Sequence, residues 1–436
     1  MPDLGLEAVI YEVFVRAYGP EGTFGEVEVD LDRIKDLGIN TIWLMPIHPV
    51  GEKNRKGSLG SPYSIRDYFA IDPALGTASD LKGLIRAAHR RGIRVIMDAV
   101  CNHTSQDSVL IEEHPEYFKR DKKGNFTTVN PDWKDVYDLD YSNPETREYM
   151  INMLEYWVRE FNIDGYRCDV ARLLPIDFWE EAISRVNKIK TGLLWLAEGD
   201  EADLHPVFHL SYNGESYRIL KDIMKGDKKP IDLAEELQCQ INTFPSNFAK
   251  LRFIENHDQM RSAALAGDIP TLEKLIVLYS LMRGSVLVYN GQEVGLKDRL
   301  SLFEPTRIEW DKGDETIFDT YRYFLEKRRS HLITHGDMQI LHPQSPGILG
   351  YIRRTSEEWL LVLVNFGKKP EEVVLALDGT LPEGIELVGE MKGRKKARFP
   401  VHSGKIFTEV ETYLILRGTS RIAIGLAPKW LLRPRK

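Results

Sequence analysis

The stretch FNIDGYRCDV, residues 161–170, holds a short apolar run that ends at the carboxylate of Asp169. Two other runs end in the same way: GLLWLAE reaches Glu198, and LRFIENHD reaches Asp258. Runs of this length, with β-branched and aromatic residues, are typical of buried parallel strands. In α/β barrels the catalytic groups stand at the carboxyl ends of such strands. The three acids therefore predict a parallel barrel with a site at one end.

Strand-like runs alternate with amphipathic, helix-like stretches over roughly 330 residues. Eight β–α units favour a closed (β/α)₈ TIM barrel, of α/β class, over an open doubly wound sheet. No GxGxxG or GxxxxGK[ST] follows a strand-like run, which argues against the main nucleotide-binding folds. The eight runs are VIYEVFV, TIWLMPI, RVIMDAV, DGYRCDV, LLWLAEG, VFHLSY, LRFIEN and SVLVYNG.

Two further parts flank or interrupt the expected barrel, which covers residues 1–103 and 144–335. Residues 104–143 carry aromatic and acidic side chains with little periodicity, and a connection this long predicts a small inserted domain. From residue 336 to residue 436, alternating runs such as EEWLLVLVNF predict an all-β sandwich domain with a basic tail.

Composition excludes several classes of function. The 436 residues have a net charge of −8, so no general attraction to nucleic acid or to an anionic membrane is expected. No signal peptide and no apolar run of about 18 residues is found. Three cysteines without CxxC spacing favour a reducing cytoplasm. Nothing in the sequence indicates an oligomeric state.

Taken in order, the strand ends resemble the conserved blocks of the α-amylase family of glycoside hydrolases and transglycosylases. Two further segments, GSPYSIRDYFAID and SVLVYNGQEVG, are similar to the blocks around the second and eighth strands. The whole set keeps the family's order from about residue 9 to residue 295, which makes the resemblance specific. The four central blocks are DAVCNH (98–103), GYRCDVARL (165–173), LAEGD (196–200) and FIENHD (253–258).

The resemblance assigns a role to each of the three acids. It makes Asp169 the nucleophile that forms a covalent glycosyl-enzyme. It makes Glu198 the general acid/base, a role that needs a carboxylic acid still protonated near neutral pH. It makes Asp258 the third carboxylate, which binds sugar hydroxyls as the transition state develops. No cofactor is then required for the chemistry.

Other residues are assigned by the same resemblance. Arg167 lies two residues before Asp169, on the same side of an extended strand, where its charge favours the ionised nucleophile. Asp98 is expected to support the strand ends. The expected substrate-binding residues are Tyr63, His103, Arg167, Arg172 and His257.

The sequence departs from the family pattern at the acceptor side and at the metal segment. Arg172 and Leu173 stand where many α-amylases have Lys-His, which puts endo-cleavage of long starch in doubt. Asn102 and Asp138 match side-chain ligands of calcium-binding relatives, but Tyr137 replaces the usual proline. Whether calcium binds is left open by the sequence, and a bound ion would have a structural role only, because oxygen ligands suit it.

The expected function is retaining hydrolysis of α-glucosidic bonds in maltooligosaccharides or related α-glucans, with short oligomers preferred to long starch. A 4-α-glucanotransferase-like transglycosylase is the alternative, because water and sugar acceptors share the first step. Isomaltulose-type or trehalose-forming activity stays open. A binding module without catalysis is disfavoured, because all three acids are present.

Overall fold

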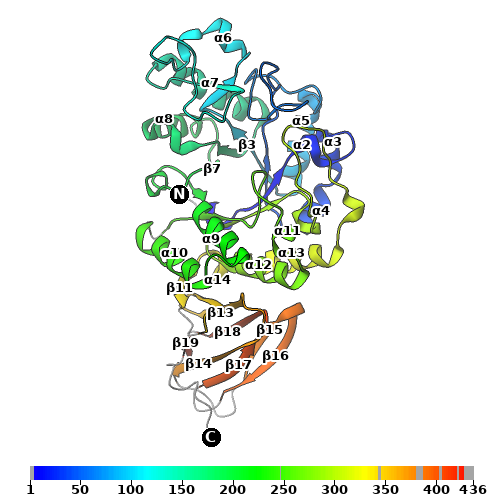
Figure 1. Ribbon diagram of the computed structural model, residues 1–436, viewed down its shortest axis with the longest axis vertical. Helices are drawn as coiled ribbons and strands as arrows, with labels where there is room; N and C mark the ends of the chain where they lie inside the picture. Colours follow the sequence, from blue (N-terminus) through cyan, green and yellow to red (C-terminus); the bar gives the residue numbers. More distant parts are fainter. Residues whose placement is uncertain are drawn as a thin grey trace.

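The computed structural model describes residues 4–245, 247–341, 345–379, 386–401, 405–419 and 422–426. Eight parallel strands form a closed barrel, which confirms the predicted fold class (Figure 1). The ring closes at β1, whose Ile10 pairs with Leu287 of β10 on one side and with Thr41 of β2 on the other. In ring order the strands are β1 (Val9–Val13), β10 (Ser285–Tyr289), β9 (Lys250–Arg252), β8 (Leu210–Tyr212), β7 (Leu194–Ala197), β6 (Gly165–Cys168), β3 (Arg94–Ala99) and β2 (Thr41–Leu44).

The barrel strands are buried on both faces because their residues alternate between two apolar cores. In β1, Ile10 packs inside the barrel with Trp43 and Ile96, whereas Val9 and Tyr11 pack outward. This explains why the strands read as nearly continuous apolar runs in the sequence.

Helices enclose the outer core, and local signals fix their ends. At the start of α7, the Asn143 side chain accepts a hydrogen bond from the Glu145 N–H, and the helix stops at Asn162 in the left-handed region. The helices are α1 (Leu4–Glu7), α2 (Val15–Tyr18), α3 (Phe24–Val29), α4 (Leu31–Asp36), α5 (Ala78–Arg90), α6 (Val109–Glu113), α7 (Pro144–Phe161), α8 (Ile176–Val186), α9 (Gly214–Lys225), α10 (Pro230–Thr243), α11 (Ser262–Ala266), α12 (Ile269–Leu281), α13 (Glu315–Lys327) and α14 (His331–Thr334). Short 3₁₀ turns are η1 (Pro115–Tyr117), η2 (Ala171–Leu173), η3 (Ala202–Leu204), η4 (Gln292–Val294), η5 (Trp310–Lys312) and η6 (Lys392–Arg394).

The seventh strand-like run ends earlier than its sequence suggests. β9 stops at Arg252, so Asp258 stands on a loop beyond the strand and not at its end. The apolar residues after Arg252 are buried, but they lie outside the strand, and the Glu255 side chain contacts residues further along the chain. It accepts hydrogen bonds from the Arg261 guanidinium at 2.7 Å and from the backbone N–H of Ser262.

The expected inserted segment, residues 104–143, lies between β3 and α7. It contains α6, and a small antiparallel pair is formed by β4 (His103–Ser105) and β5 (Val136–Asp138). In this pair His103 lies opposite Asp138. The segment rises above one end of the barrel (Figure 1).

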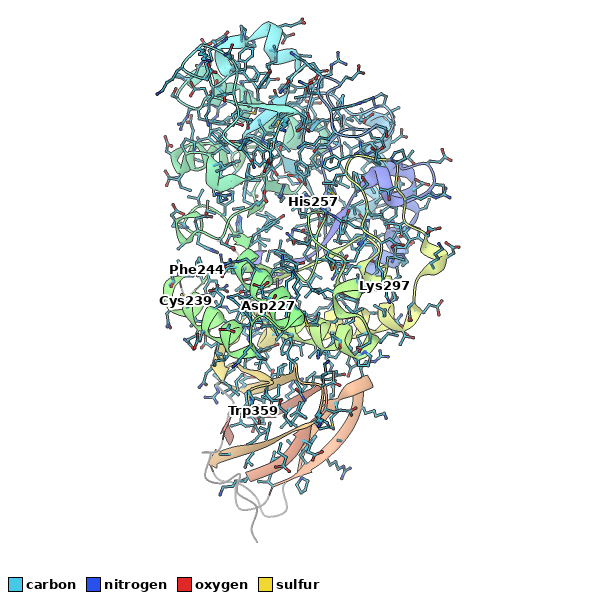
Figure 2. All side chains as sticks on the ribbon, viewed as in Figure 1. Asp227, Cys239, Phe244, His257, Lys297 and Trp359 are labelled. Atoms are coloured by element: carbon cyan, nitrogen blue, oxygen red, sulfur yellow. The ribbon has the colours of Figure 1, made fainter. Side chains whose placement is uncertain are left out.

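The C-terminal strands form two antiparallel sheets that share one apolar core, as in a β-sandwich. Trp359 is fully buried in that core (Figure 2). The sheets lie at the end of the molecule furthest from the inserted segment (Figure 1). The expected basic tail falls outside the described residues. The six-stranded sheet has the order β11 (Asp337–Leu341), β12 (Ile348–Arg354), β13 (Glu358–Asn365), β18 (Tyr413–Thr419), β15 (Glu386–Met391), β16 (Lys395–Pro400), and the three-stranded sheet has the order β17 (Lys405–Val410), β14 (Glu371–Gly379), β19 (Ile422–Leu426).

The sheets meet the barrel at the C-terminal end of α12. Arg353 Nη1, from β12, donates to the Leu281 carbonyl at 3.3 Å. Beside it, Arg328 Nη1, which follows α13 in the barrel part, donates to the Ser280 and Met282 carbonyls at 2.9 and 3.0 Å. These carbonyls have no partner within the helix, so the two buried arginines satisfy them. Within the described ranges, every helix is too short or too polar to span a lipid bilayer.

Candidate active site

A cavity of about 230 Å³ opens where the barrel strands end. It lies in the barrel part of the molecule, where Figure 2 labels His257. The structure brings six of the predicted site residues to its lining: Tyr63, His103, Asp169, Glu198, His257 and Asp258.

Arg167 is the central cation of this site, and its side chain is only 1% exposed. Its Nη1 lies 2.9 Å from Asp98 Oδ1 and 2.7 Å from Asp169 Oδ1. Its Nη2 lies 2.7 Å from Glu198 Oε2. The register of β3 against β6 places Asp98 directly beside Arg167. One guanidinium thus holds the carboxylates of three strand ends together.

Burial dominates the electrostatics of the nucleophile candidate. It raises the pKa of Asp169, and the nearby carboxylates of Glu198 and Asp98 raise it further, while Arg167 opposes the rise. Burial also raises the pKa of Asp98, which accepts hydrogen bonds from the Trp43 indole at 3.2 Å and the Tyr63 hydroxyl at 3.0 Å. Asp98 therefore does not line the pocket but holds the side chains of Arg167 and Tyr63 in place beneath it.

Glu198 is positioned by strained backbone. It accepts a 2.7 Å hydrogen bond from the backbone N–H of Val170, the residue after Asp169. Val170 has φ 39° and ψ 42°, a left-handed conformation that β-branched residues rarely adopt. Such strain costs about 1–3 kcal/mol and persists only where the surroundings enforce it. The Glu198 side chain remains 25% exposed, so solvent can reach it from the pocket.

His257 is held between two carboxylates. Its Nδ1 hydrogen-bonds Glu12 of β1, and its Nε2 lies 3.2 Å from Asp258 Oδ2. Burial alone would lower the pKa of His257, but Asp258 and Glu12 raise that pKa well above its ordinary value. Burial alone would raise the pKa of Asp258, but His257 and Arg167 lower that pKa overall. The ring also stacks on Tyr63, with centroids 5.2 Å apart.

His103 differs from His257 because, among the residues that the structure describes, no carboxylate is hydrogen-bonded to its ring. Burial lowers its pKa to about 4, so it is neutral at pH 7. Its ring lies 5.0 Å from the ring of Trp133, which comes from the inserted segment. The pocket therefore presents one charged and one neutral histidine.

Arg172 is not brought into the pocket. It lies exposed on η2, with its Cβ close to Gly199, the residue after Glu198. Arg172 does not line the cavity, and its acceptor-side role stays a prediction.

The expected calcium ligands fit a calcium ion poorly. Asp138 Oδ1 lies 3.4 Å from Asn102 Nδ2, and Asp138 Oδ2 accepts the Val129 N–H and lies 4.0 Å from the Lys119 ammonium. Calcium takes about 6–8 oxygen ligands. Across the described part of the chain, no group of three or more His, Cys, Asp or Glu residues could hold a metal. Calcium stays a prediction from the sequence, and no chemistry is assigned to it.

Several residues of the site escaped the sequence reasoning. Glu12 was visible as a lone acid within the first strand-like run, but its partner His257 is 245 positions away. Glu12 is buried behind His257 and does not line the cavity, whereas Lys56, Asp135 and Phe303 do. They lie on loops, where no periodic signal marks a residue as facing a pocket.

The sequence matches the family model for the α-amylase catalytic domain over residues 18–136, 128–194 and 194–329. The crystal structure of a noncanonic maltogenic α-amylase, AmyB from Thermotoga neapolitana, is 37% identical with a TM-score of 0.88, covering 95% of this chain and 99% of its own. An α-amylase structure from Lactobacillus plantarum is 35% identical with a TM-score of 0.87, covering 96% of this chain and 100% of its own. Alpha-amylase 2 of Dictyoglomus thermophilum is 30% identical, over 86% of this chain and 71% of its own.

Proposed function

The chain belongs to the α-amylase family of glycoside hydrolases, and from this premise we propose how its site hydrolyses α-glucans and which ones it prefers. The activity is hydrolysis of α-glucosidic bonds with retention, the outcome general to the family. The proposal concerns the residues that perform each step and the length of the preferred substrate.

Asp169 attacks the anomeric carbon while Glu198 donates a proton to the departing glycosidic oxygen. Glu198 then takes a proton from water, which displaces Asp169 and releases the sugar with its original anomeric configuration. Asp258 binds hydroxyls of the ring as positive charge develops on it.

The observation that most strongly supports these catalytic roles is that one guanidinium contacts two carboxylates. Arg167 contacts Asp169 through Nη1 and Glu198 through Nη2. The two carboxyls that a double displacement requires are therefore bound to one cation at the same end of the barrel, each within reach of a bond that lies in the pocket.

Tyr63, His103 and His257 hold the sugar that is cleaved. The Tyr63 ring stacks on His257 and lines the pocket, where the apolar face of a sugar can pack against it. Glu198 and Asp258 are partly open to solvent, which favours water over a sugar as the acceptor. We therefore favour hydrolysis over transglycosylation, with maltooligosaccharides as substrates.

The test uses purified enzyme on maltose, maltotriose to maltoheptaose, isomaltose, pullulan and cyclodextrins. We expect rapid hydrolysis of short maltooligosaccharides, and proton NMR should show the α-anomer first. Asp169→Asn should lower kcat by about 10⁴-fold or more with an unchanged thermal melt, because it removes the nucleophile.

Asp203→Asn, on the exposed turn η3, is the control and should keep full activity. A β-anomer as the first product, or an Asp169→Asn enzyme within tenfold of the parent, would overturn the assignment. Longer oligosaccharides formed from maltotriose would favour transfer instead.

We also infer an intracellular location from the thiols. Cys101 and Cys168 are free and buried, and Cys239 is free and exposed. An exposed free thiol is more readily kept in a reducing compartment. Fractionation of the source cells with an antibody to the protein tests this location.

A further inference from the structure

Three loops at one side of the pocket are joined into a continuous barrier, here called the loop wall. It consists of residues 51–60 after β2, residues 133–136 of the inserted segment and residues 301–304 after β10. Lys56 Nζ lies 3.0 Å from Asp135 Oδ1, which joins the first loop to the second. The Leu59 N–H donates to the Phe303 carbonyl at 2.9 Å, which joins the first loop to the third.

Further contacts make the loop wall rigid. Ser58 Oγ donates to Glu304 Oε2 at 2.6 Å. From beneath, Arg16 Nη2 donates to the carbonyls of Gly60 at 3.0 Å and Leu302 at 2.7 Å. Gly57, with φ +64°, allows the backbones to meet, because a Cβ there would stand 2.6 Å from the Phe303 carbonyl oxygen. The loop wall is therefore a fixed part of the pocket.

The order of the barrel strands places two of the three loops of the loop wall, those after β2 and β10, opposite Glu198. β2 and β10 are the two neighbours of β1, and β7, which leads to Glu198, is the fourth strand from β1 in either direction. The general acid protonates the leaving oxygen, so the departing part of the substrate lies on the Glu198 side. The loop wall consequently stands at the donor end, where the non-reducing end of the substrate points.

We propose that Lys56, held in the loop wall by Asp135, is a specificity-determining residue that closes the donor end. Maltooligosaccharides then enter by their non-reducing ends and lose short units of fixed length. The inference rests on the glycosidase function proposed above. It also specifies that cleavage starts from the non-reducing end of the substrate, which neither the three acids nor membership of the family establishes.

The size and character of the pocket support closure at this end. Its volume of about 230 Å³ lies below the range of roughly 300–1,000 Å³ typical of small-molecule sites, so few sugar units fit behind the cleaved bond. The Lys56 side chain is 37% exposed while Asp135 is 4% exposed, so the ammonium stands at the rim above its partner. The Lys56 Nζ also lies 5.9 Å from the centre of the Phe303 ring, which continues the barrier.

The test compares a maltoheptaoside carrying a chromogenic group at its reducing end with the same compound blocked at its non-reducing end. The parent enzyme should cleave the free compound at least about tenfold faster, because the blocked end cannot pass the loop wall. In Lys56→Ala the rate on the blocked compound should rise about tenfold and early products should become mixed in length. Phe303→Ala opens the same barrier from another loop and should act in the same direction.

Two control variants show whether the effect is specific to Lys56 and whether it depends on its charge or on its size. Lys53→Ala removes an exposed lysine from the same loop and should leave the product pattern unchanged. Lys56→Met keeps most of the bulk without the charge, so restored discrimination there would assign the closure to size rather than to the ion pair. Thermal melts show whether each variant is folded.

The outcomes also distinguish the two proposals. If the parent enzyme hydrolyses none of the maltooligosaccharides, the proposed function itself fails. If it hydrolyses them but cleaves blocked and free compounds at equal rates, only the closure is wrong. A product pattern in folded Lys56→Ala and Phe303→Ala that matches the parent would likewise overturn the role of the loop wall.

Discussion

Two histidines a short distance apart in the pocket carry different charges because their neighbours differ. Burial keeps His103 neutral, whereas Glu12 and Asp258 keep His257 protonated. Glu12 is itself completely buried, and its Oε2 has no hydrogen-bond partner among the described residues. Burial raises the pKa of Glu12, and His257 is the main group that opposes this rise. Glu12 is thus a positioning residue that acts on the substrate through the ring.

Glu12→Gln should move the alkaline limb of the kcat/KM profile. The raised pKa of His257 means that its ion pairs are complete below the ordinary histidine pKa of about 6.5 and are lost as pH rises through the raised value. Removing the Glu12 carboxylate lowers the pKa of His257, so the alkaline limb should shift to lower pH by about one unit. Kinetics from pH 5 to 10 measure the shift.

A matched control for this change is Glu293→Gln. Glu293 is equally buried but lies beside Tyr11 and Arg33, away from the pocket lining. It should lower stability without moving the pH profile. If both variants shift the profile alike, the effect is structural and the positioning role of Glu12 is wrong.

Single residues also show how far sequence reasoning reaches. Asp169 and Glu198 were predictable because each directly follows its strand, β6 and β7. Asp258 was found by its motif but misplaced, because the apolar residues after Arg252 read as strand although they lie outside it. Glu12 and Lys56 depend on partners far along the chain, and no local pattern reveals such a contact.

Among the elements, the turn from β6 into η2 contains a residue, Val170, whose strained backbone also positions Glu198. Val170→Gly should release backbone strain of about 1–3 kcal/mol, less about 0.5–1 kcal/mol for the greater freedom of glycine in the unfolded chain. The same change should lower kcat, because the Val170 N–H no longer fixes Glu198 as firmly. A higher Tm together with a lower kcat is the expected pair of results.

Val129→Gly is a suitable control, because Val129 is 59% exposed on a loop of the inserted segment. It should lower Tm slightly or not at all and leave kcat unchanged. A Val170→Gly enzyme that loses stability would show that the left-handed turn is not strained.

The barrel strands could be predicted from the sequence, whereas the small strands of the inserted segment could not. All eight barrel strands were recognisable because each buries both faces, although β8 and β9 proved short. The interior of residues 104–143 was not predictable, because its small strands β4 and β5 depend on each other across the segment and not on local periodicity.

At the scale of the whole molecule, the barrel and the C-terminal sheets share one apolar core. Tyr351 of β12 and Val362 of β13 belong to the same buried cluster as Leu278 of α12. The bond from Arg353 of β12 to the Leu281 carbonyl of α12 joins the same two parts. Alternating runs predicted where the sheets begin, but they gave no indication that the sheets complete the barrel's packing.

Calorimetry should therefore show one unfolding transition for the described barrel and sheets together. Arg353→Met should lower the free energy of unfolding by about 1–3 kcal/mol, because it leaves buried carbonyls such as that of Leu281 without a donor. KM should not change, since Arg353 does not line the pocket. Two separate transitions, with only the second moved by Arg353→Met, would contradict a shared core.

The closure of the ring at β1 has a consequence for the nascent chain. β1 leaves the ribosome early, but one of its two neighbours, β10, is translated only after the other seven barrel strands. Until then β1 offers an unpaired edge, which is a template for pairing with other chains. Contacts this distant in sequence also form slowly. Chaperones that shield the growing polypeptide should therefore raise the yield of folded enzyme most while translation is still short of β10.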